Sequence, residues 1–104
     1  MPHLRIEYSA NLEPQIDMGE FCQVLHQVVM TTGLFERGAL RLRAFKSEHY
    51  AVADLLPQNA FIDMEFRVGQ GRSDDALKSA GNAIFDAATA YLQALFAAPH
   101  FALS

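Results

Sequence analysis

The sequence predicts an α+β domain that is built from two βαβ-type halves. Residues 3–9, 39–46 and 60–68 alternate between apolar and polar side chains, as half-buried strands do. Residues 17–33 and 73–96 repeat their apolar residues at helical spacing instead. The order is strand, helix, strand, linker, strand and helix, and only residues 101–103 are left for a last strand. We therefore expect a single domain over residues 1–104, with a first half at about 1–46, a second half at about 60–104 and a short C-terminal end.

The first strand follows directly on Pro2. Its residues Leu4, Ile6 and Tyr8 fall on one face, and the polar residues between them fall on the other. If Met1 is removed, the Pro2 nitrogen becomes a free secondary amine at a fixed place on the sheet. Nearby cations and desolvation would keep such an amine neutral and basic near neutral pH. The alternative is that Pro2 merely begins a strand, where a missing N–H costs little.

The first helix has recognisable ends. Asp17 is expected to cap its N-terminus with Glu20 as the capping-box partner, and Gly33 to close its C-terminus. The strand at residues 39–46 would then lie parallel to the first strand, because such crossovers are right-handed and return the chain to the same sheet. The buried face of the helix is expected to contain Phe21, Val24, Leu25, Val28 and Val29.

The middle of the chain gives a weaker signal. Residues 50–53 could form a short edge strand before the clear alternation of residues 60–68. Ser73 is expected to cap the second helix, with Asp74 in its first turn, where the helix dipole favours an acid. Pro99 is expected to end this helix.

Composition argues against several classes of protein. The chain has 104 residues, 51% of them apolar, and a net charge of −4 from 8 basic and 12 acidic residues, so a general nucleic-acid binder is not expected. We also expect neither a membrane span nor a secretory signal, because both need a long apolar run. The single cysteine, Cys22, suits a reducing cytoplasm. The histidines lack ligand spacing with one another or with Cys22, so a metal site is not expected.

Three segments carry a resemblance to a known family. They are PHLRIEYSAN at residues 2–11, TGLF at 32–35 running on to ALRLR at 39–43, and VGQGRS at 68–73. Together, and in this order along nearly the whole chain, they resemble the 5-carboxymethyl-2-hydroxymuconate isomerase family of the tautomerase superfamily. Members of that family continue into a further segment beyond the position that corresponds to Ser104.

The resemblance implies a tautomerase-like fold, a four-stranded sheet with two helices on one face, that assembles as a homotrimer. It also implies a pocket at a subunit interface, with an N-terminal proline as the acid–base group and without a metal or organic cofactor. The substrate would be a small dicarboxylate of the 2-hydroxymuconate type. The family's arginines correspond to Arg41 on the second strand and Arg72 before the second helix.

The chemistry of these residue types agrees with proton transfer in an unsaturated keto/enol dicarboxylate. A neutral Pro2 amine can take a proton from one atom of the substrate and return it to another. Arg41 and Arg72 would bind a carboxylate in bidentate fashion or stabilise the dienolate, because guanidinium groups remain charged. The alternative is that Arg41 belongs to the solvated face of a strand and that Arg72 is a turn residue.

Two other functions stay open at this point. One is a non-catalytic, oligomeric member of the fold that binds a metabolite or a protein. The other is a different proline-dependent reaction on an unsaturated acid, such as hydration, which would need an extra acid to activate water. Phe45 and Phe61 lie on the polar side of their strands, and we expect them to contact another subunit.

Overall fold

The computed structural model of this chain describes residues 2–104, so the expected removal of Met1 concerns a residue outside the described part. The α+β class and the order of the three long strands and two long helices are confirmed. The elements are β1 (His3–Ser9), η1 (Ala10–Leu12), α1 (Met18–Thr31), η2 (Arg37–Ala39), β2 (Arg41–Ser47), β3 (Ala60–Arg67), α2 (Asp74–Tyr91), α3 (Gln93–Phe96) and β4 (Phe101–Leu103).

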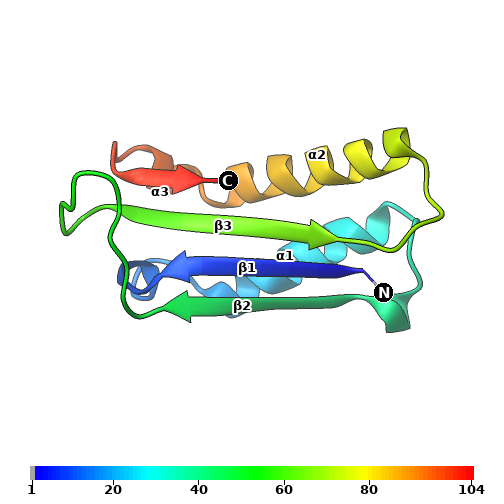
Figure 1. Cartoon of the computed structure of the whole chain (residues 1–104), viewed down its shortest axis with the longest axis horizontal. Helices are drawn as coiled ribbons and strands as arrows, with labels where there is room; N and C mark the ends of the chain where they lie inside the picture. Colours follow the sequence, from blue (N-terminus) through cyan, green and yellow to red (C-terminus); the bar gives the residue numbers. More distant parts are fainter. Residues whose placement is uncertain (1) are drawn as a thin grey trace.

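The four strands form one mixed sheet in the order β2-β1-β3-β4 (Figure 1). Strand β1 runs parallel to β2, strand β3 runs parallel to β4, and the two pairs meet along the antiparallel pair of β1 and β3. Each parallel pair is joined through a helix, so the two expected βαβ halves are present. The three residues of β4 pair with Ala60–Ile62 and close the second half as a short edge strand.

Both long helices cover one face of the sheet, and the core lies between these two layers. Leu4 and Ile6 of β1 are fully buried there, together with Phe21 of α1, and Ile84 of α2 is almost fully buried. Burial of each such side chain contributes about 1.5–3 kcal/mol, so this face fixes the register of β1. The predicted division of β1 into a buried and a polar face is confirmed. Within residues 2–104, no helix is both long and apolar enough to cross a membrane.

The helix caps form where the sequence predicts them. The Asp17 carboxylate accepts a hydrogen bond from the Glu20 backbone N–H at 3.0 Å, and Ser73 Oγ accepts one from the Ala76 N–H at 3.1 Å. Gly33 follows α1 with a φ of +72°, a conformation that glycine adopts without strain. The Glu20 side chain does not complete the capping box but accepts a hydrogen bond from the Tyr91 hydroxyl at 2.8 Å. It thereby links α1 to the last residue of α2.

The expected edge strand at residues 50–53 is wrong, because this segment belongs to a loop. The side-chain amide of Asn59 donates to the Val52 carbonyl at 3.1 Å and to the Asp54 carboxylate at 2.7 Å. Ala53 and Leu55 have φ values of 51° and 67°, which lie outside the extended region that a strand requires. A buried side-chain amide therefore organises this loop in place of a strand ladder.

The expected single helix up to Pro99 is also wrong, because α2 ends at Tyr91 and a separate turn, α3, follows. The chain leaves the helical conformation at Leu92, whose φ and ψ are −95° and 14° and whose side chain is buried. Phe96 of α3 then packs on Phe101 of β4, with ring centroids 5.1 Å apart. The apolar spacing continues through this break because both helices face the same core, which explains why the pattern suggested one helix.

Candidate functional site

A cavity of about 450 Å³ lies where the N-terminal end of β1 meets the loop after α1 and the turn before α2. Figure 1 shows these segments gathered at one end of the sheet. The volume falls in the range of small-molecule sites. The cavity is lined by Pro2, Gly33, Leu34, Phe35, Glu36, Ala39 and Arg72.

Pro2 is buried and belongs to the lining of this cavity. Its carbonyl oxygen accepts a hydrogen bond from the Arg41 backbone N–H at 3.0 Å, so the pairing of β1 with β2 extends to Pro2 itself. The strand pairing continues at the next residue, where His3 lies opposite Arg41. The sheet therefore fixes the position of the Pro2 backbone.

Arg72 lies against the loop that follows α1. Its Nε and Nη2 atoms each lie 3.4 Å from the Leu34 carbonyl oxygen, and its Cζ lies 4.6 Å from the centre of the Phe35 ring. Within residues 2–104 the structure gives Nη1 of Arg72 no hydrogen-bond partner, so this nitrogen is free to bind an anion. Pro2 and Arg72, far apart in the sequence, thus share one cavity.

Arg41 lies beside this cavity, but its side chain does not line it. Its Nη1 donates to the carbonyl oxygens of Gly38 at 2.9 Å and Leu40 at 3.0 Å, and the residue is exposed. The structure therefore joins the Arg41 backbone to Pro2 while the guanidinium binds the η2 segment. Of the three predicted site residues, Pro2 and Arg72 line the cavity together.

Positive charge surrounds the start of β1. On the sheet face opposite the helices, His3 lies in register with Arg41 on one side and Arg67 on the other. The Nη1 atom of Arg43 lies 3.1 Å from Nδ1 of His3. Desolvation lowers the pKa of His3 from its ordinary value, and the charges of Arg67, Arg43 and Arg41 lower it further. The site next to Pro2 therefore disfavours an additional positive charge.

Phe35 and Glu36 are among the five cavity residues that sequence reasoning did not assign to the site. Phe35 belongs to one of the segments that resemble the isomerase family, but the sequence of that segment alone gives Phe35 no role. Glu36 is an exposed acid in a loop, which composition and spacing cannot distinguish from any surface carboxylate. Only the return of the chain after α1 towards Pro2 reveals that both residues line the same cavity.

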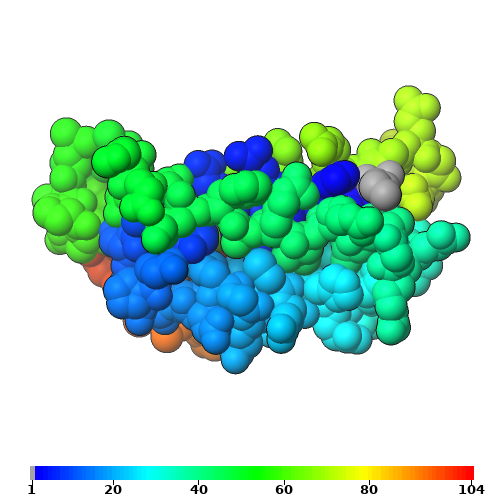
Figure 2. Space-filling model, turned by 90° about the horizontal axis from the view of Figure 1, so that it is seen from below, coloured from blue at the N-terminus to red at the C-terminus, as the bar shows by residue number. Residues whose placement is uncertain are grey.

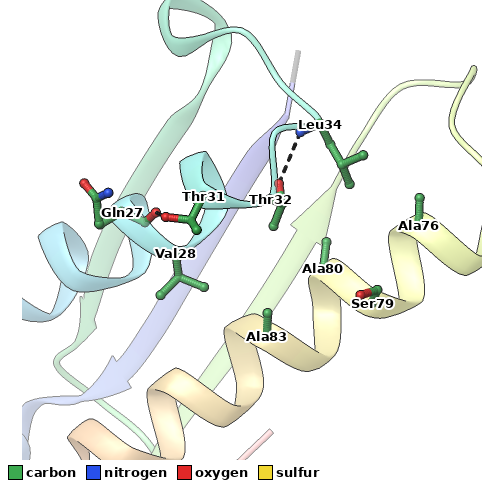
Figure 3. A pocket seen from close by; sticks show the side chains of 9 residues that line it. All are labelled: Gln27, Val28, Thr31, Thr32, Leu34, Ala76, Ser79, Ala80 and Ala83. Atoms are coloured by element: carbon green, nitrogen blue, oxygen red, sulfur yellow. Dashed lines mark hydrogen bonds between the residues drawn. The ribbon is translucent and has the colours of Figure 1, made fainter.

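A second hollow of about 460 Å³ lies between α1 and α2 (Figure 3). Its lining contains only neutral side chains, namely Gln27, Val28, Thr31, Thr32, Leu34, Ala76, Ser79, Ala80 and Ala83. Side chains of these types do not transfer protons near neutral pH. The cavity at Pro2 is the candidate active site because two of the three predicted site residues, Pro2 and Arg72, line it together.

Comparisons with known proteins identify the family of this chain. A family model described as 5-carboxymethyl-2-hydroxymuconate isomerase matches residues 2–104. The 5-carboxymethyl-2-hydroxymuconate Delta-isomerase of Escherichia coli is 27% identical over 104 residues, which are 100% of this chain and 82% of the relative.

Two solved structures are also similar. A 5-carboxymethyl-2-hydroxymuconate delta-isomerase has a TM-score of 0.91 at 33% identity, over 99% of this chain and 78% of its own. A 5-carboxymethyl-2-hydroxymuconate isomerase from Deinococcus radiodurans R1 has a TM-score of 0.91 at 35% identity, with the same coverage of 99% and 78%.

The lowered pKa of His3 gives a test of the charge around Pro2. In an NMR titration, the His3 ring should become protonated at a pH below the ordinary value of 6.5. Arg67→Gln should move this midpoint upward, because one of the repelling charges is removed. As a control, Arg37→Gln, in η2 and not among the groups that shift His3, should leave the midpoint in place. A His3 midpoint above 6.5 in the unaltered protein would contradict this description of the site.

Proposed function

Because this chain belongs to the 5-carboxymethyl-2-hydroxymuconate isomerase family, we propose that Pro2 and Arg72 form the proton-transfer site of a tautomerase-type isomerase. The observation that carries the proposal is the cavity that both residues line. The proposed substrate is a small unsaturated keto/enol dicarboxylate of the 2-hydroxymuconate type, in line with the names of the relatives. The matched family and the relatives are named as isomerases, and this favours a catalytic function over a non-catalytic binding protein.

In this proposal Met1 is absent from the working protein and the Pro2 nitrogen is a secondary amine. The neutral amine accepts the proton of the substrate's 2-hydroxyl group, which leaves a conjugated dienolate. The ammonium form then returns that proton to a carbon further along the conjugated chain, and the amine is neutral again. The nearby charges of Arg72, Arg41 and Arg67 favour the neutral amine at the start of the cycle.

Arg72 holds the negative charge of the substrate in this scheme. Its free Nη1 can bind a carboxylate or the dienolate oxygen, and charge-assisted hydrogen bonds are about twice as strong as neutral ones. This difference in strength between charge-assisted and neutral hydrogen bonds also supports a role for Arg41. A substrate carboxylate would replace the neutral Gly38 and Leu40 carbonyls as its partner, so that Arg41 binds the second carboxylate.

A second candidate function is the addition of water to an unsaturated acid. The observation that favours it is the Glu36 carboxylate in the lining of the Pro2 cavity, because such a reaction needs an acid–base group to activate water. The two functions differ in their products, since isomerisation keeps the mass of the substrate and hydration adds one water. We place isomerisation first because the family match covers residues 2–104.

We also propose that the chain works as a homotrimer in the cytoplasm. The sheet face opposite the helices is open within the described residues, and it forms the concave upper profile in Figure 2. Phe45 on this face is 43% exposed, and the Arg5 Cζ lies 4.7 Å from the centre of its ring. A neighbouring subunit on this face would bury Phe45 and bring further side chains towards the Pro2 cavity.

Kinetics of arginine variants test the assigned site. Arg72→Ala and Arg41→Ala should each lower kcat/KM for a 2-hydroxymuconate-type dicarboxylate by roughly a hundredfold, the size typical of a lost charge-assisted contact to the transition state. Lysine at either position should restore only part, because it lacks the planar fork. The control Arg37→Ala, in η2, should change kcat/KM little. Equal and small effects at all three positions would remove the assigned site.

Native mass spectrometry tests the assembly. The expected result is a trimer, since the apolar fraction of 51% and the exposed Phe45 favour a covered surface. Phe45→Lys should weaken this trimer, whereas Phe85→Lys, which replaces an equally exposed phenylalanine on α2, should preserve it. A monomer at micromolar concentration would be incompatible with the proposed assembly.

A further inference from the structure

We propose that Phe35 is a positioning residue that orients the Arg72 guanidinium for the carboxylate or dienolate of the substrate. This inference rests on the proposed function of the same cavity. The Cζ of Arg72 lies 4.6 Å from the centre of the Phe35 ring, within the distance at which a cation is attracted to an aromatic face. Phe35 itself would not touch the reacting atoms but would act through Arg72.

The hydrogen bonds of Arg72 are too long to fix the guanidinium by themselves. Both its Nε and its Nη2 lie 3.4 Å from the same Leu34 oxygen, whereas good N–H···O bonds are about 2.9–3.0 Å long. Two long bonds to one acceptor leave the guanidinium plane able to tilt about that oxygen. The Phe35 ring provides a second, differently placed contact that restricts this tilt.

The Phe35 ring also packs against the hydrophobic core. Phe66 of β3 meets Phe35 edge to face, with centroids 5.8 Å apart and planes at 88°. Both phenylalanines pack against the buried cluster that fills the space between sheet and helices. An edge-to-face pair of this kind is a favoured arrangement of aromatic rings. The core therefore determines the plane of the Phe35 ring, and the ring determines the plane of the guanidinium.

The loop that carries both contacts is tied to the end of α1. The Gly33 N–H donates to the Met30 carbonyl at 3.1 Å, and the Leu34 N–H donates to Thr32 Oγ1 at 3.3 Å, the bond drawn in Figure 3. Leu34 and Phe35 are consecutive, so their contacts with Arg72 move as a unit. The guanidinium is thereby ordered before a ligand arrives, and less entropy is lost when the ligand binds.

The guanidinium of Arg41 is held in a different way from that of Arg72. The Arg41 guanidinium binds two backbone carbonyls at 2.9 Å and 3.0 Å, which occupy Nη1. In Arg72 the hydrogen bonds to Leu34 use Nε and Nη2, and the contact with the Phe35 ring uses no N–H donor, so Nη1 stays available. Stacking on Phe35 thus holds the cation in place without competing with the substrate.

A double-mutant cycle between Phe35 and Arg72 tests this inference. Phe35→Leu should lower kcat/KM for the dicarboxylate by roughly tenfold, in keeping with a cation–π contact between two partly buried side chains. Phe35→Tyr should keep most of the activity because it retains the aromatic face. In an Arg72→Ala background, Phe35→Leu should have no further effect on kcat/KM. Phe85→Leu, an exposed phenylalanine on α2, serves as the control for loss of a ring elsewhere.

The outcomes separate the inference from the proposed function. If Phe35→Leu lowers kcat/KM by the same factor with and without Arg72, Phe35 acts on the fold and the inference is overturned. It is also overturned if Phe35→Leu is as active as the unaltered protein. If Phe35→Leu does not fold, Phe35→Met supplies the same cycle, because methionine fills the space without a ring face. A full-activity Arg72→Ala protein would instead overturn the role of Arg72 in the proposed function.

Discussion

The pairing of β1 between two neighbouring strands is the constraint on which the rest of the structure depends. Strand β1 binds β2 on one side and β3 on the other, and its apolar face is sealed by both helices. The hydrogen bond from the Arg41 N–H to the Pro2 carbonyl continues this pairing to the last residue before the strand. The group that we assign to proton transfer is therefore held by one of the two inner strands of the sheet.

Much of this fold follows from the sequence because each strand and helix has one consistently apolar face. Leu4 and Ile6 alternate with polar residues, and Phe21, Leu25 and Val29 recur at helical spacing, so burial alone decides their arrangement. The two wrong predictions of secondary structure lie where another interaction replaces this apolar pattern. Asn59 organises residues 52–54 through its side-chain amide, and Leu92 turns the chain towards β4 without interrupting the apolar spacing.

The site is less accessible to sequence reasoning than the fold. Resemblance and chemistry point to Pro2 and Arg72, and the structure adds that these two residues line one cavity. Phe35 and Glu36 could not be found in this way, because their positions depend on how the loop after α1 returns to the sheet. The place of the Arg41 guanidinium was equally unforeseeable, since it depends on carbonyl groups of the η2 segment that local spacing does not reveal.

The central claim is that a free Pro2 amine carries the proton, and one measurement tests it directly. Two preparations, identified by intact mass, would be compared for turnover of a 2-hydroxymuconate-type substrate: one that begins at Pro2 and one that retains Met1. Retained Met1 converts the Pro2 nitrogen into an amide, which has no basic lone pair. We predict that the first preparation isomerises the substrate and that the second is folded but inactive. Equal turnover by both preparations would contradict the claim.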